Sequence, residues 1–152
     1  MDNSPYLCVH EALRFRKEVC GGEEKIYNYC TKLAADGGRR MAEILGTNVI
    51  EVPGSHRCFF ANIRLPVLLA KEGNKVDEQN AVKIAGWIAE KLASEQDTFL
   101  GIYLHAGNLW ARLSAQIYLD LRDVEKGAQA LKDLCRRVAK GEYLRGTSCS
   151  VS

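Results

Sequence analysis

The sequence predicts an α+β fold in which helices cover one face of a small antiparallel sheet of about four strands, preceded by a long N-terminal helix. Two periodicities predict this class. Apolar residues recur every three or four positions in long segments, as in helices, and every second position in shorter runs, as in strands. The 152 residues suffice for one ordinary core. We therefore expect a single domain over 1–145 and a flexible tail over 146–152.

The N-terminal part is expected to contain two helices. Ser4 and Pro5 can start the first, because a serine oxygen caps free amides and proline lacks a donor that the first turn does not use. Gly21-Gly22 is expected to end it, and a longer helix then continues to a stop at Gly46. The apolar stripe of this second helix consists of Ile26, Cys30, Leu33, Gly37, Met41 and Ile44.

A glycine pair, Gly37-Gly38, lies within this stripe. Each glycine costs a helix about 1 kcal/mol relative to alanine. The pair indicates either a kink or a place where another element approaches the backbone closely, and we expect the close approach.

Two β-prone runs follow, at 48–52 and 57–65. In the second run the residues expected to share one face are Phe59, Ala61, Ile63 and Leu65. Pro66 should end that strand, and residues 71–77 are expected to form a polar surface connection. Asp77 can then cap a helix that fades near Gln96. Its apolar face carries Ala81, Ile84, Ala85, Ile88 and Leu92.

The C-terminal part is expected to form a hairpin and a last helix. Residues 98–104 and 110–118 are strand candidates separated by a short link containing Gly107-Asn108, which is typical of an antiparallel hairpin. Asp120 or Asp123 caps the following helix, and Gly141 ends it. The apolar positions of this helix are Val124, Ala128, Leu131, Cys135 and Val138.

Composition excludes several classes of function. Lys plus Arg number 21 against 19 Asp plus Glu, and a net charge of +2 spread along the chain favours neither nucleic acid nor an anionic membrane. The longest uncharged stretch, 98–111, is shorter than the roughly 20 apolar residues of a membrane-spanning helix. No basic and apolar leader follows Met1. We expect a cytoplasmic protein that contacts neither nucleic acid nor membrane.

The six cysteines are expected to be reduced thiols that act as small core residues, because no export signal is evident. No C-x-x-C or H-x-x-x-H spacing occurs, so no metal site is expected. No cysteine has a histidine beside it in a recognisable nucleophile setting, which argues against a thiol enzyme.

Several segments resemble one enzyme family. Residues 110–118 (WARLSAQIY), followed by a capped helix, resemble the C-terminal strand and helix of class V aminotransferase-like enzymes, which use pyridoxal phosphate. The branch most similar is the fungal isopenicillin-N-epimerase-like and hercynylcysteine-sulfoxide-lyase-like one. Segments 2–7, 12–16, 21–24 and 42–47 resemble the same branch in the same order. The resemblance covers nearly the whole chain and implies the small C-terminal domain of a fold-type-I enzyme.

The resemblance implies a role for Arg112. In the family the arginine of this strand binds the α-carboxylate of the substrate, and a guanidinium offers a planar fork to both carboxylate oxygens. The sequence alone leaves two other interpretations open: Arg112 points to solvent from the open face of the sheet, or it pairs with an acid such as Asp120. His105 lies near the expected mouth of the active site, as a site-lining residue or an ordinary surface imidazole. Trp87 and Trp110 are interpreted as core or interface aromatics.

Groups that pyridoxal phosphate chemistry requires are not recognisable. The cofactor needs a lysine amine, an acid facing the pyridine nitrogen and donors for the phosphate. None of the ten lysines lies in anything like the family's Ser-x-His-Lys neighbourhood, and no glycine-rich phosphate cradle appears. The family also has a threonine-containing segment before the position of Asp2, where this chain begins instead with Met1.

We therefore expect a truncated class V domain without catalytic residues, inactive alone and binding no pyridoxal phosphate by itself. It would meet an amino-acid-like substrate only in a full-length context. The alternative is a non-catalytic interaction module that associates with a full-length homologous subunit. A third interpretation is a gene fragment without a function of its own.

Overall fold

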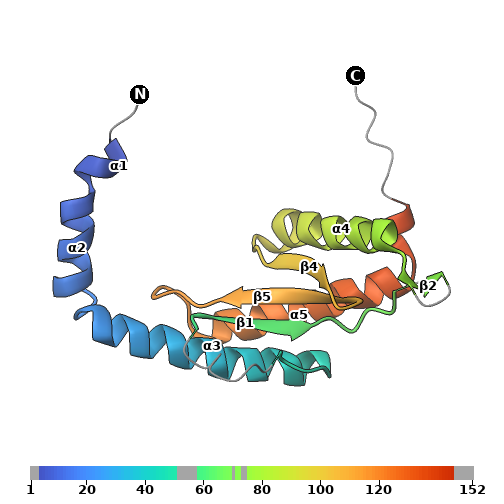
Figure 1. The fold of residues 1–152 in the computed structure, drawn as a ribbon, viewed down its shortest axis with the longest axis horizontal. Helices are drawn as coiled ribbons and strands as arrows, with labels where there is room; N and C mark the ends of the chain where they lie inside the picture. The colour runs from blue at the N-terminus through green and yellow to red at the C-terminus, as the bar shows by residue number, and fades with distance from the viewer. Residues whose placement is uncertain (1–3, 51–57, 70, 73–74, 146–152) are drawn as a thin grey trace.

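The computed structural model describes residues 4–50, 58–69, 71–72 and 75–145. Its elements, labelled in Figure 1, are α1 (Ser4–Leu7), α2 (Val9–Glu18), α3 (Glu23–Leu45), β1 (Phe60–Arg64), β2 (Lys71–Glu72), β3 (Lys75–Val76), α4 (Glu78–Gln96), β4 (Gly101–His105), β5 (Asn108–Ser114), α5 (Leu121–Ala139) and the 3-10 helix η2 (Glu142–Leu144). The expected α+β class is confirmed. The tail expected over 146–152 lies outside the described residues.

A three-stranded antiparallel sheet forms the centre, in the order β1-β5-β4. Helices α3 and α5 pack against each other and α4 packs on β4 and α5, so the three long helices form a layer on one face of the sheet. The sheet has three strands, where the sequence suggested about four. Of the run expected at 48–52, Val49 makes a single bridge to Ile63, and residues 51–57 lie outside the described part. Two-residue strands β2 and β3 form a separate small hairpin that the sequence analysis had not predicted.

The N-terminal region differs in one respect from expectation. The first helix starts at Ser4 but is divided into α1 and α2 at Cys8, where the backbone ψ of −11° departs from the regular helical value. Gly21 and Gly22 have φ values of +79° and +95°, which glycine adopts without strain, and there the chain turns sharply into α3. Figure 1 shows α1 and α2 projecting away from the sheet.

The expected helix caps are confirmed. The side chain of Asp77 accepts a hydrogen bond from the amide of Asn80 at 3.0 Å. At the start of α5 both candidate caps are used: Asp120 accepts from the Asp123 amide at 3.2 Å, and Asp123 accepts from the Asp120 amide at 2.9 Å. This reciprocal capping box fixes where α5 begins. None of the described helices has both the length and the apolar content to span a membrane.

The glycine pair of α3 marks close packing against the sheet, as expected. A Cβ added to Gly37 would lie 2.9 Å from the Leu113 side chain, and one added to Gly38 would lie 2.7 Å from the Cβ of Ala61. Such distances are far below van der Waals contact. Helix α3 can therefore approach β1 and β5 only because these two positions lack side chains.

We predict that Gly38→Ala destabilises the protein by about 1–3 kcal/mol, because the new methyl group meets a Cβ of β1 that cannot rotate away. Gly86→Ala in α4 is the matched control. Nothing lies within 4 Å of a Cβ added at Gly86, so this change should stabilise by up to about 1 kcal/mol through helix propensity. Urea unfolding measures both, and equal effects of the two substitutions would contradict the close approach.

Candidate functional site

Alternation along β5 places Arg112 on the face of the sheet opposite the helices. Leu109, Ala111 and Leu113 are buried in the core that the helices share. Successive strand residues point to opposite faces, so Trp110 and Arg112 point to the other face. Of these two, Trp110 is buried and Arg112 is exposed.

The side chain of Arg112 is held by neighbours on both adjoining strands. Its Nε donates a hydrogen bond to Oδ1 of Asn62 at 3.4 Å, and Asn62 is its direct register partner on β1. The guanidinium carbon lies 5.2 Å from the ring centroid of Phe60 and 5.3 Å from that of Tyr103. Two aromatic faces attract the cation and limit where it can move.

No carboxylate within 4.0 Å neutralises Arg112 among the residues that the structure describes. Asp120, which the sequence suggested as a partner, caps α5 instead by accepting a hydrogen bond from the Arg122 amide. Its Oδ2 lies 3.3 Å from Nε of Arg122. The segments FANIR, GIYLH and NLWARLS of the three strands contain no Asp or Glu. The guanidinium therefore keeps its fork of donors available to an external anion.

A hollow of about 550 Å³ opens beside Arg112, where β4 begins and β5 ends. Gly101, the register partner of Arg112 on β4, contributes no side chain, and a Cβ added there would meet only the Cβ of Arg112 at 4.0 Å. Apolar residues lining the hollow include Phe99, Leu100, Leu119 and Val124, and Asp123, whose carboxylate caps α5, also borders it. A carboxylate on Arg112 would thus have space for a small apolar group next to it.

His105 is exposed on the same sheet face but lies far from Arg112. It pairs with Asn108 at the turn end of the hairpin, whereas Arg112 pairs with Gly101, four residues away along β4. At the rise of an extended strand this separation is about 13 Å. The backbone oxygen of His105 accepts a hydrogen bond from Nε1 of Trp110 at 2.9 Å. The structure therefore gives His105 a backbone role in the sheet and does not bring its imidazole to Arg112.

The sequence did not predict three of the residues that contact Arg112: Phe60, Asn62 and Tyr103. A signal for Tyr103 was present, because the two-residue turn at Ala106 and Gly107 fixes the hairpin register. Phe60 and Asn62 depend on the pairing of β1 with β5 across 50 residues, which no local pattern specifies.

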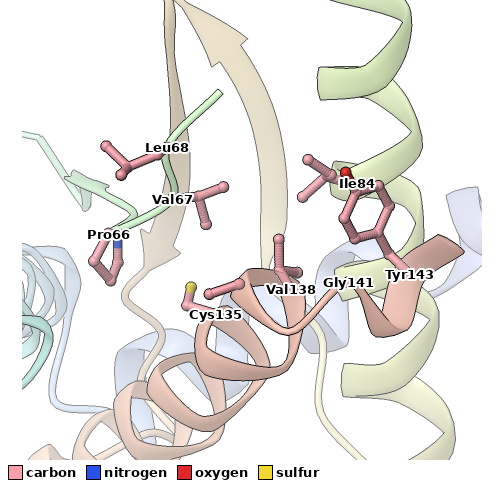
Figure 2. A pocket seen from close by; sticks show the side chains of 9 residues that line it. Pro66, Val67, Leu68, Ile84, Cys135, Val138, Gly141 and Tyr143 are labelled. Atoms are coloured by element: carbon pink, nitrogen blue, oxygen red, sulfur yellow. The ribbon is translucent and has the colours of Figure 1, made fainter. Parts of the chain in front are cut away.

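A second hollow, of about 380 Å³, lies between the exit of β1 and helices α4 and α5 (Figure 2). Its walls are mostly apolar, and Cys135 and Val138 of α5 border it. Burial raises the pKa of the Cys135 thiol to about 12, so the sulfur is protonated and a poor nucleophile at neutral pH. No group of three potential metal ligands occurs within the described part of the chain.

Comparison with known proteins agrees with the family that the sequence resembles. An L-cysteine desulfhydrase-like protein of Epichloe uncinata, lolT2, is 37% identical over 93% of this chain and 34% of its own length. A second such protein of the same fungus, lolT1, is 35% identical over 93% of this chain and 35% of its own length. The hercynylcysteine sulfoxide lyase of Schizosaccharomyces pombe is 30% identical over 88% of this chain and 30% of its own length. No protein-family model matches the chain.

The chain is homologous to class V pyridoxal-phosphate enzymes. It spans about a third of the length of these relatives. Identity between 30% and 37% over about nine-tenths of the chain confirms the expected relationship.

The residues described here do not fit the cofactor of this class V family. No lysine occurs in β1, β4 or β5, and no described lysine lines either hollow. The described lysines of the long helices face solvent or lie near acids, as Lys91 does 3.3 Å from Glu95. The imine chemistry that pyridoxal phosphate supplies needs a lysine amine within the site. Among the described residues, the surroundings of Arg112 thus include no lysine that could hold the cofactor.

We predict that the buried cysteines are inert in the folded protein. Iodoacetamide at pH 8 should label exposed Cys8 and leave Cys135 and Cys30 unmodified, since burial raises the pKa of both buried thiols. Mass spectrometry of the labelled peptides measures this, and urea should release the protected sites. Labelling of Cys135 as fast as Cys8 would contradict the buried placement.

Proposed function

We propose that this chain is the substrate-carboxylate-binding domain of a class V pyridoxal-phosphate-dependent enzyme, with Arg112 as the binding residue. The chain has no catalytic residues of its own, and turnover requires the cofactor-bearing part of such an enzyme from elsewhere. The substrate would be an amino acid or a close analogue.

One observation carries the proposal: Arg112 is held in place on three sides yet has no acidic partner in the described structure. Asn62, Phe60 and Tyr103 fix its position, and none of them neutralises its charge. A carboxylate that arrives from outside would supply the missing negative charge and accept two parallel hydrogen bonds from the fork. The names of the relatives refer to L-cysteine and to hercynylcysteine sulfoxide, and both compounds carry an α-carboxylate.

The contribution of this domain would be binding and orientation. Bidentate contact with Arg112 fixes both the position and the rotation of the substrate carboxylate, which places the adjoining α-carbon toward the reacting groups of the enzyme. Arg112 would supply positive charge and hydrogen-bond donors to the substrate.

We predict that L-alanine binds the chain weakly and that Arg112→Gln lowers the affinity by about tenfold, since charge-assisted hydrogen bonds are lost. Titration followed by the Nε–H signals of the arginines in NMR spectra measures this at constant ionic strength. Arg112→Lys should retain part of the affinity as a point charge.

Arg145→Gln is the matched control, because Arg145 is exposed and has no acidic partner within 4.0 Å in the described structure. L-Alaninamide, which lacks the carboxylate, should not bind. Unchanged affinity in Arg112→Gln would overturn the proposed role. At a stoichiometric amount of pyridoxal phosphate, no single lysine should give a visible absorbance band that borohydride fixes covalently, and such a band confined to one lysine would overturn the absence of a cofactor lysine.

Helices α1 and α2, together called the helical arm, favour a second candidate function. In this function the chain is a non-catalytic module that associates with a full-length homologous subunit. Helix α2 buries none of its residues, and Leu13, Phe15 and Val19 are exposed by 59%, 49% and 70%. A helix of ten residues is marginal without tertiary contacts. Large exposed apolar side chains on an unsupported helix are typical of interaction surfaces.

If the arm binds a homologous subunit, Phe15→Ser should weaken co-purification with a full-length relative, because it removes apolar area from the contact. Lys17→Ser on the same helix should not, since Lys17 is a charged exposed residue. Light scattering coupled to size exclusion measures the complex. A stable monomer in the presence of the relative would exclude this second function.

A further inference from the structure

A second arginine, Arg64, lies on the same open sheet face as Arg112. It ends β1, is exposed and pairs in register with Trp110, whereas Arg112 pairs with Asn62. Because strand residues two apart share a face, Arg64 and Asn62 point to the same side as Arg112. Arg64 and Arg112 are therefore diagonal neighbours on adjacent strands, about 7–8 Å apart at the backbone. Two long side chains at that distance can reach one small molecule.

These two arginines differ from those of the helices. Each arginine in α2, α3 and α5 has a carboxylate oxygen within 4.0 Å; Arg16 with Glu23 and Arg137 with Glu95, both at 2.6 Å, are examples. Within the described structure neither Arg64 nor Arg112 has such a partner, and the three strands contain no acid. Two like charges placed close together repel each other unless an anion lies between them.

A buried and firmly held residue, Trp110, separates the two arginines on this face. Trp110 pairs in register with Arg64 on β1 and with Tyr103 on β4. Its side chain is 7% exposed and is fixed by the hydrogen bond from Nε1 to the oxygen of His105. A short hydrocarbon chain with an acidic group at each end could span the distance between the two arginines.

From this arrangement we infer that Arg64 is a specificity-determining residue that binds a second acidic group of the substrate. Arg112 takes the α-carboxylate, as in the proposed function on which this inference rests, and Arg64 takes a carboxylate or sulfur oxyacid at the end of the side chain. The substrate class is then amino acids with an acidic side chain, and neutral ones bind less tightly.

L-Glutamate and L-glutamine test the inference, because they have the same shape and differ in the charge of the side-chain group. In NMR titrations of the whole chain at constant ionic strength, glutamate should bind about fivefold more tightly than glutamine. Glutamate should shift the Nε–H signals of both Arg64 and Arg112, and glutamine that of Arg112 alone. Arg64→Gln should remove the preference for glutamate over glutamine.

Each outcome separates the inference from the proposed function. Equal affinities for the two ligands, or a preference that persists in Arg64→Gln, would overturn the role of Arg64 and leave that of Arg112 intact. Absence of any response at Arg112 to either ligand would overturn the proposed function. The signals of the unsubstituted protein decide the matter even if Arg64→Gln fails to fold, and Arg145→Gln controls for a general change in charge.

Discussion

One-sided burial of β5 determines where the functional groups of this chain lie. Leu109, Ala111 and Leu113 are buried under the helices, and the two-residue period of a strand then sends Trp110 and Arg112 to the opposite face. A register shift by one residue would bury the guanidinium in an apolar core without a partner, at a free-energy cost that no nearby group offsets. The core therefore specifies the orientation of Arg112 although Arg112 is not part of it.

The distribution of charge follows from the same division of the molecule. Acidic and basic residues of the helices lie close to each other along and between their exposed surfaces, as Arg40 does with Glu43 and Glu125, so much of their charge is compensated locally. The three strands of the central sheet carry only basic charge. A nearly neutral chain thus presents a positive potential at the open sheet face, where an anion meets little competition from protein carboxylates.

The sequence predicted those features that depend on interactions between residues near each other along the chain. Asp77 and Asp120 cap helices because their side chains reach the nearest free amides, and the glycine pair of α3 indicated a close approach before the partner element was known. The aromatic contacts of Arg112 depend instead on pairing between distant strands. The run at 48–52 had the composition of a strand, and its described part lies along β1: Val49 bridges Ile63, and backbone hydrogen bonds join Ile50 to Asn62 and Arg64 to Asn48.

A carboxylate-binding arginine and a nucleophilic lysine need different surroundings in a protein. A guanidinium binds carboxylates while it remains half exposed and fully protonated, so two aromatic rings and one amide on a small sheet suffice to position it. An amine that must act as a nucleophile at neutral pH needs a lowered pKa, which requires a desolvated site or nearby positive charge. No described lysine of this chain lines either of the two hollows or belongs to the central sheet. In the proposed function, binding of the carboxylate therefore resides in this chain, whereas the reacting amine comes from another part of the enzyme.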